Sequence, residues 1–176
     1  MLLSHTRLVT ATIAATSAVA LGTVAAPALT VRATPKKITP SGAGAVKLGK
    51  THGQLAAARL VGRIGPGCEL GGPNTRSARL RAPLKGSVDY TQSSPRKVTV
   101  VTVRGGATAR GVGIGATRAA VRQAYPKVVF DHATDETFAI TLAKVPRSGG
   151  GRLQFAIDTT TKKVTLIGIP QISFCE

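Results

Sequence analysis

The chain has 176 residues, of which 24 are Lys or Arg and 7 are Asp or Glu, so its formal net charge at pH 7 is +17. It contains no Trp, and its 2 Tyr and 4 Phe lie in apolar patterns rather than among the basic residues. Proteins that bind single-stranded nucleic acid need exposed aromatic rings for stacking, and no helix-turn-helix, zinc-finger or RNA-recognition motif is present. We therefore expect no nucleic-acid partner, despite the positive charge.

Residues 1–28 are typical of a signal peptide. Polar His5 and Arg7 precede an apolar stretch, and Ala26-Pro27-Ala28 provides a small-x-small cleavage site. Ala18-Val19-Ala20 is an earlier alternative. An uncleaved anchor is a further alternative, because residues 8–31 carry no charge, but Ala and Thr dominate that stretch and Pro27 interrupts it. We expect a secreted protein with no membrane span after cleavage.

The mature chain is strongly basic. Without residues 1–28 it has 23 Lys and Arg against 7 Asp and Glu, a formal charge of +16. Such a charge attracts polyanions over a long range. Outside a cell these are wall polymers, acidic polysaccharides, anionic lipids or acidic proteins. The alternative is that the Arg-, Ala- and Gly-rich composition reflects a GC-rich genome.

Cys68 and Cys175 are the only cysteines. An even pair in an exported chain predicts a disulfide. Two isolated cysteines without a nearby His make a poor metal site. A catalytic thiol is also disfavoured, because Cys175 is the penultimate residue and Cys68 lies in a Gly- and Pro-rich segment.

The predicted elements begin after a linker. Residues 29–45 are rich in Pro, Gly, Thr and Lys without periodicity, which predicts a flexible, solvated segment. Thr51 is then predicted to cap a helix that extends to about residue 60 and buries Leu55 and Ala58. Residues 62–74 are expected to form a long loop.

Strands follow this loop. Residues 77–82 alternate, so that Ala78, Leu80 and Ala82 are expected to point inward and Arg79 and Arg81 outward. Residues 87–91 and 97–103 flank a turn-forming segment and predict a hairpin.

The second part of the chain repeats this plan. Thr117 is predicted to cap a helix that buries Val121 and Ala124 and ends before Pro126. Four strands are then expected, at residues 127–130, 137–142, 152–157 and 162–169.

A 66-residue offset links the two parts. Leu48-Gly49-Lys50-Thr51 recurs as Ile114-Gly115-Ala116-Thr117, and Arg96-Lys97-Val98-Thr99 recurs as Lys162-Lys163-Val164-Thr165. A constant offset predicts tandem units with preserved internal lengths. We expect an α+β protein of two units, residues 46–110 and 111–176, each a short helix packed on a three- to four-stranded antiparallel sheet.

Residues 111–116 match the dinucleotide fingerprint G-x-G-x-x-A, and Asp131 lies 20 residues after Gly111. Three observations oppose a cofactor site. The equivalent residues 46–49 keep the helix start without the same glycines, residues 105–110 are too long for the tight turn, and too few residues follow Asp131 for a doubly wound sheet. No cofactor is expected.

The other chemistry-bearing residues do not form a recognisable site. Asp131 and His132 could serve a nucleophile, but no nucleophile elbow is present, so a solvated surface pair is expected. The acidic residues 131–136 lack the Gly and terminal Glu of a calcium loop. Asp89 and Asp158 are predicted near hairpin ends, with nothing to bring them together. We expect no metal site and no enzymatic activity.

The helix openings resemble those of the secreted β-lactamase inhibitory protein and of small outer-membrane-assembly lipoprotein domains. Those folds usually open with Gly-Met-Thr and an apolar residue four positions after the Thr. Here Gly49-Lys50-Thr51 with Leu55, and Gly115-Ala116-Thr117 with Val121, match except at the Met. Residues 113–117, 121–126 and Cys175 also resemble a domain common in secreted proteins of high-GC Gram-positive bacteria. The resemblance, over about residues 45–176, implies protein–protein interaction but transfers no partner.

We therefore expect an exported, monomeric binding protein that acts at the cell envelope or in the medium through a sheet face or its loops. The expected contact residues are Arg79, Arg81, Arg96 and Lys97. One alternative is a basic protein that is retained at the wall because it binds anionic polymers through diffuse charge. Inhibition of a secreted hydrolase is a special case of the first expectation, and an enzyme of unrecognised type is the remaining alternative.

Overall fold

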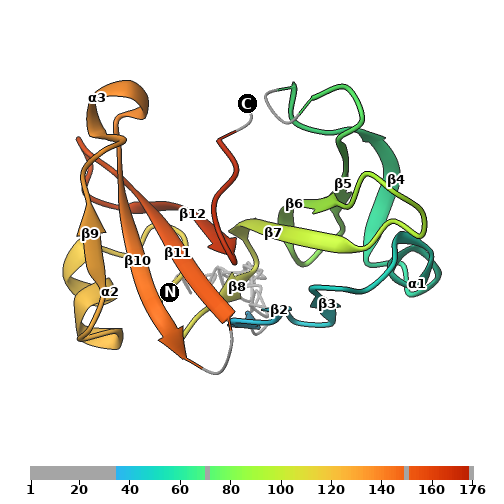
Figure 1. Cartoon of the computed structure of the whole chain (residues 1–176). Coiled ribbons are helices and arrows are strands. Elements are labelled where there is room, and N and C mark those ends of the chain that lie inside the picture. The colour runs from blue at the N-terminus through green and yellow to red at the C-terminus, as the bar shows by residue number, and fades with distance from the viewer. Residues whose placement is uncertain (1–34, 70–71, 149–150, 175–176) are drawn as a thin grey trace, which may run out of the picture. The chain divides into compact units, whose positions relative to one another are not determined.

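The computed structural model describes residues 35–69, 72–148 and 151–174, all within one compact unit (Figure 1). Strands dominate, and the few helices are short, which agrees with the expected α+β class. The helices are α1 (His52–Ala57), α2 (Arg118–Ala124) and α3 (Asp135–Phe138). The strands are β1 (Lys36–Thr39), β2 (Gly42–Ala43), β3 (Val46–Lys47), β4 (Val61–Pro66), β5 (Arg76–Leu80), β6 (Lys85–Tyr90), β7 (Val98–Gly105), β8 (Ala107–Thr108), β9 (Val129–Asp131), β10 (Ile140–Ser148), β11 (Gly151–Asp158) and β12 (Val164–Ile169).

The described strands form two sheets. The larger sheet has eight antiparallel strands in the order β4-β5-β6-β7-β12-β11-β10-β9. The smaller sheet has the order β3-β2-β1-β8, and β1 runs parallel to β8. Because β7 pairs with β12, strands β4–β7 from before α2 and strands β9–β12 from after it share one sheet. We call β4–β7 the first half of this sheet and β9–β12 the second half.

Threonine caps start the first two helices, as the sequence predicts. The Thr51 side chain accepts a hydrogen bond from the Gln54 N–H at 3.3 Å, and the Gln54 side chain accepts one from the Thr51 N–H at 3.1 Å. This reciprocal pair is a capping box. At α2 the Thr117 side chain accepts a hydrogen bond from the Ala120 N–H at 3.2 Å. Each cap satisfies a donor that the first helical turn leaves without a partner.

The buried positions of these helices agree with the prediction except at one residue. Leu55 and Val121 are buried, and Ala124 is half-buried against the core. Ala58 is exposed, so its predicted burial is wrong. The reason is that α1 ends at Ala57 and Ala58 is its C-cap.

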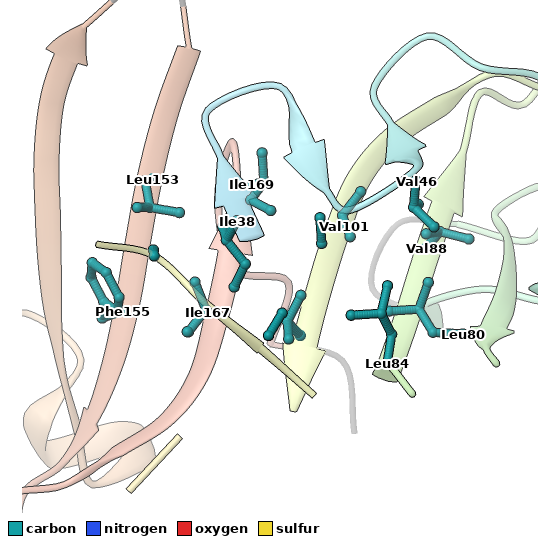
Figure 2. Close-up of a cluster of buried hydrophobic side chains, with 14 of the residues drawn as sticks. Ile38, Val46, Leu80, Leu84, Val88, Val101, Leu153, Phe155, Ile167 and Ile169 are labelled. Carbon is teal, nitrogen blue, oxygen red and sulfur yellow. The ribbon is translucent and has the colours of Figure 1, made fainter. Parts of the chain in front are cut away.

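One apolar core lies on one face of the eight-stranded sheet and is continuous across both halves (Figure 2). Val88 and Val101 come from the first half, Phe155 and Ile167 come from the second, and Ile38 comes from the smaller sheet. Side chains alternate along a strand, so the neighbours of these residues lie on the opposite face. We call the face that carries this cluster the core face and the opposite face the outer face.

The linker predicted for residues 29–45 is wrong over its described part. β1 and β2 lie within it, and Ile38 and Ala43 are buried in the core. Pro40 and Gly44 lie in the turns between very short strands. Residues 29–34 lie outside the described residues, as does the predicted signal peptide.

Three further predictions of local structure also need correction. β4 occupies the first part of the loop expected at residues 62–74. β5 ends at Leu80, and Ala82 is exposed in the turn that follows rather than inward-facing. The strand expected at residues 137–142 begins only at Ile140, because α3 takes up Asp135–Phe138. Strand pairing, a turn and a short helix decide these three boundaries, and the local sequence pattern does not.

Candidate functional site

The outer face of the first half carries a polar cavity with a volume of about 610 Å³. Its floor comes from three adjacent strands, each of which contributes two polar side chains. These are Ser77 and Arg79 on β5, Ser87 and Asp89 on β6, and Thr102 and Arg104 on β7. We call this hollow the polar cavity.

The strand register places these side chains side by side. Arg79 faces Ser87, and Ser87 faces Thr102, so one row of polar side chains crosses the three strands. The next row contains Ser77, which faces Asp89. Their sequence neighbours Ala78, Val88 and Val101 are buried in the core. The core therefore holds the strands in place, and the polar groups stand on a rigid floor.

Asp89 is the acidic group on this floor. Burial raises the pKa of its carboxyl group, and a hydrogen bond with the Ser173 side chain partly offsets that rise. A raised carboxyl pKa means that the surroundings disfavour the ionised form. Residues with such perturbed pKa values in a hollow are candidates for a functional site.

Two segments from distant parts of the sequence wall the polar cavity. Pro66 ends β4 and is followed by Cys68 and Glu69, and Ser173 and Phe174 belong to the segment after β12. The Thr75 hydroxyl donates hydrogen bonds to the carbonyls of Cys68, at 2.7 Å, and Gly72, at 2.9 Å. These bonds fix the loop at the cavity's edge.

The predicted disulfide involves one of these walls. Cys68 lines the polar cavity together with Phe174, which directly precedes Cys175 in the chain. Cys175 lies outside the described residues, so the pairing with Cys68 stays a prediction.

Part of the outer face of the second half is covered by apolar packing. Leu142, Ala156 and Leu166 form a buried cluster with Ile172 of the segment after β12. We call residues 170–174 the C-terminal segment. The Ile172 N–H donates a hydrogen bond to the Gln154 side chain at 3.0 Å. The Phe174 ring stacks on that of Phe138 with centroids 4.6 Å apart.

Gly168 permits the C-terminal segment to fold back against the end of β12. A Cβ atom at this position would lie 2.3 Å from the Gln171 carbonyl oxygen and 2.6 Å from a side-chain carbon of Ile172. Both distances are shorter than any van der Waals contact, so no larger residue fits without movement of the segment.

The structure separates the four predicted contact residues. Arg79 lines the polar cavity, but Lys97 precedes β7 and lies five residues from Thr102, roughly 17 Å along an extended strand. The Arg96 guanidinium donates hydrogen bonds to carbonyls of its own turn, Thr91 at 3.4 Å and Gln92 at 3.1 Å. These residues do not form one site.

Arg81 is exposed beyond the end of β5 and does not line the polar cavity. Its backbone N–H donates a hydrogen bond to the Leu60 carbonyl at 2.9 Å.

Sequence reasoning missed Asp89 and Arg104 as members of a site. The sequence predicts Asp89 near a hairpin end and a strand that stops at residue 103. The available signal was alternation, because Thr102 and Arg104 interleave with the apolar Val101 and Val103. Only the pairing of β5, β6 and β7 brings these residues together with Arg79.

The acidic residues 131–136 lie apart from the polar cavity, on the second half. Asp131 pairs with Lys144, and that hydrogen bond is the largest cause of its lowered pKa. His132 pairs with Asp135 at 2.7 Å rather than with Asp131, and its hydrogen bond lowers the pKa of Asp135. No group of three His, Cys, Asp or Glu side chains suited to a metal ion occurs among the described residues.

Two of the three glycines in residues 111–116 have a backbone explanation. Gly111 and Gly115 have φ angles of 82° and 83°, which side-chain-bearing residues rarely adopt. Gly111 lies in a tight turn in which Ala109 and Val112 exchange backbone hydrogen bonds of 2.8 and 3.0 Å. The carboxylate of Asp131 is engaged by Lys144 and by the Ala133 N–H at 3.0 Å.

No family model, curated protein or solved structure matches the chain. Among residues 35–69, 72–148 and 151–174, no helix is long and apolar enough to cross a membrane.

Proposed function

We propose that this chain is an exported, non-enzymatic binding protein whose polar cavity receives part of a partner protein at the cell envelope or in the medium. The observation that carries the proposal is the contrast on the outer face. On the second half the C-terminal segment packs on the apolar row Leu142, Ala156 and Leu166, whereas the first half presents a hollow of about 610 Å³ with charged and hydroxyl side chains. Export rests on the sequence of residues 1–28.

The chemistry of the polar cavity suits protein recognition. Arg residues are enriched among the side chains that dominate binding energies at interfaces, because a planar guanidinium forms several directed hydrogen bonds. Arg79 stands beside the hydroxyl groups of Ser87 and Thr102 on a sheet floor. Because burial raises the pKa of Asp89, the ionised carboxylate lowers the stability of the unbound protein. Such a stability cost is common at functional surfaces.

We also infer that the two halves of the sheet are copies of one helix-and-sheet unit. Backbone hydrogen bonds at the predicted 66-residue offset support this. Gly49 N–H donates to Val98 O, and Gly115 N–H donates to Val164 O, both at 2.8 Å. The helix openings of the two units resemble those of the β-lactamase inhibitory protein, and this resemblance is compatible with a protein partner.

A second pair of bonds supports the same inference. Val98 N–H donates to Lys50 O at 2.9 Å, and Val164 N–H donates to Ala116 O at 2.8 Å. The donor and acceptor are again each displaced by 66 residues. On this inference the two copies differ in two features. The first carries the polar residues of β5–β7, and the second is packed against the C-terminal segment.

Affinity capture from the secreted and envelope fractions tests the proposed function. The baits are the mature protein, a Ser87→Trp variant that fills the polar cavity, and a Lys163→Trp control at an exposed position outside it. We expect the wild type and the control to retain the same partner, and Ser87→Trp to lose it. Retention of that partner by Ser87→Trp would remove the polar cavity from the binding surface.

The net charge of the mature chain supports a second candidate, retention at anionic wall polymers without a defined site. A salt series separates the two, because attraction between exposed charges fades once the screening length becomes short. Binding through the polar cavity should persist at high salt and be lost in Ser87→Trp. Charge-driven retention should vanish with salt and be equal in all three baits. A captured hydrolase whose activity falls on binding would identify an inhibitor.

A further inference from the structure

A second hollow, of about 790 Å³, opens where β1 passes the end of α2 and the strands β10 and β11. Its deepest lining residues are Ile38 and Leu153, which are buried. Half-buried Tyr125, Val128 and Val145 line its sides. We call it the cationic groove. Its volume and its mainly apolar lining are those of a small-molecule site.

Three exposed cations from three separate segments stand at this groove. Lys37 belongs to β1, Arg110 follows β8, and Lys127 follows α2. No Asp or Glu is among the residues that line it. The groove therefore combines apolar walls with a rim of one sign of charge.

The structure holds Arg110 in place at the rim. Its guanidinium donates a hydrogen bond to the Ala124 carbonyl at 3.3 Å, at the end of α2. It also lies 5.1 Å from the centroid of the Tyr125 ring, a favourable cation–π arrangement. The Tyr125 ring in turn packs against Phe155 in the core, with centroids 5.5 Å apart. A cation fixed beside an apolar hollow loses little conformational freedom when it binds an anion.

We propose that the cationic groove binds a single-chain anionic amphiphile, with the alkyl chain along the apolar walls and a carboxylate or phosphate head at Arg110 and Lys127. A neutral apolar ligand would leave the cations unused, and a small inorganic anion would leave the apolar walls in water. Only a molecule with both parts matches the groove. The occupant is the free amphiphile and not a bilayer, because a concave hollow cannot lie flat on a membrane surface. This site is separate from the polar cavity and does not depend on its function.

Calorimetric titration of the mature protein with decanoate, below its micelle concentration, tests the proposal. Decyl maltoside supplies the same chain with a neutral head, and acetate supplies the charged head alone. We expect decanoate to bind about tenfold or more tightly than either, because only decanoate gains both hydrophobic and ionic contacts. The Ser87→Trp variant should bind decanoate normally, which separates this site from the polar cavity.

Two matched double variants assign the contribution of charge. Arg110→Gln with Lys127→Gln should weaken decanoate binding about tenfold and leave decyl maltoside unchanged, whereas Lys162→Gln with Lys163→Gln, which removes the same charge elsewhere, should change neither. Val128→Glu, which places a carboxylate in the wall, should also weaken decanoate binding.

Several results would overturn the proposal. These are equal affinity for decanoate and decyl maltoside, equal losses in both double variants, or no binding of decanoate at all. Co-sedimentation with anionic vesicles, in the absence of decanoate binding, would assign the cations to a membrane surface instead.

Discussion

The two halves of the eight-stranded sheet have similar core faces but outer faces that differ in one row of side chains. On the core face both contribute buried apolar side chains to one cluster. On the outer face, the row Ser77, Asp89 and Val100 crosses the first half, and the row Leu142, Ala156 and Leu166 crosses the second. The C-terminal segment covers the apolar row, whereas Ser77 and Asp89 line the polar cavity. In the first half, the apolar cluster is confined to the core face, and the outer face is available for binding.

Loss of the predicted disulfide should have the largest effect. Cys68→Ser with Cys175→Ser, or a reductant, should lower the free energy of unfolding by about 4–5 kcal/mol, because the closed loop is longer than a hundred residues. It should also release the C-terminal segment from its place between the two halves. Denaturant unfolding with and without reductant checks this, and the double variant should not respond to reductant. An unchanged wild-type midpoint under reductant would contradict the pairing.

A carboxylate placed in the buried apolar row of the second half should lower the free energy of unfolding by nearly as much. Ala156 is fully buried, so Ala156→Asp puts into the second half the side chain that β6 carries at Asp89. We expect a loss of about 3–5 kcal/mol, because the new charge is buried without a partner. Ala56→Asp, at an exposed position on α1, should change stability by less than about 0.5 kcal/mol. Similar values for the two variants would mean that the second half is not closed.

Gly168→Ala tests the close approach of the C-terminal segment. The added methyl group would meet the Gln171 carbonyl oxygen, and we expect a destabilisation of roughly 1–3 kcal/mol. Gly65→Ala in β4 is the matched control, since a Cβ there meets nothing within 4 Å. Thermal unfolding of both variants gives the comparison, and equal melting temperatures would show that the segment does not pack as described.

Asp89→Asn should have the smallest effect on stability, and the opposite sign. Burial raises the folded-state pKa of Asp89, so its ionisation opposes folding at neutral pH. This destabilisation disappears as the pH falls through the folded-state pKa and then below the unfolded-state pKa, where the carboxyl group is protonated in both states. The variant should be more stable than wild type at neutral pH, and the difference should close in acid. A difference that is constant with pH would assign the effect to packing instead.

Local features of the fold could be predicted from the sequence because they depend on neighbouring residues. Thr51 and Thr117 cap helices as expected. Alternation correctly placed Ala78 and Leu80 inward and Arg79 outward. The strands β1–β3 could not be predicted, because segments of two to four residues form strands only when the rest of the fold supplies pairing partners.

Less of the candidate site could be predicted. Arg79 was identified as an outward basic residue, but its cavity neighbours Asp89 and Arg104 come from other strands, and Ser173 comes from the end of the chain. Long-range pairing decides which polar residues meet, and the pattern within one strand does not contain that information. The same limit applies to the cationic groove, whose cations come from three segments.

A matched pair of charge removals tests the central claim, that the open half of the outer face is the binding surface. Arg79 and Lys144 occupy one row of the sheet, which continues from Arg79 through Ser87, Thr102, Gly168 and Gln154 to Lys144. The measurement is the dissociation constant of the captured partner for Arg79→Gln and for Lys144→Gln. We predict that Arg79→Gln weakens binding by about tenfold or more and that Lys144→Gln leaves it within about twofold. Equal losses, or a larger loss for Lys144→Gln, would contradict the account.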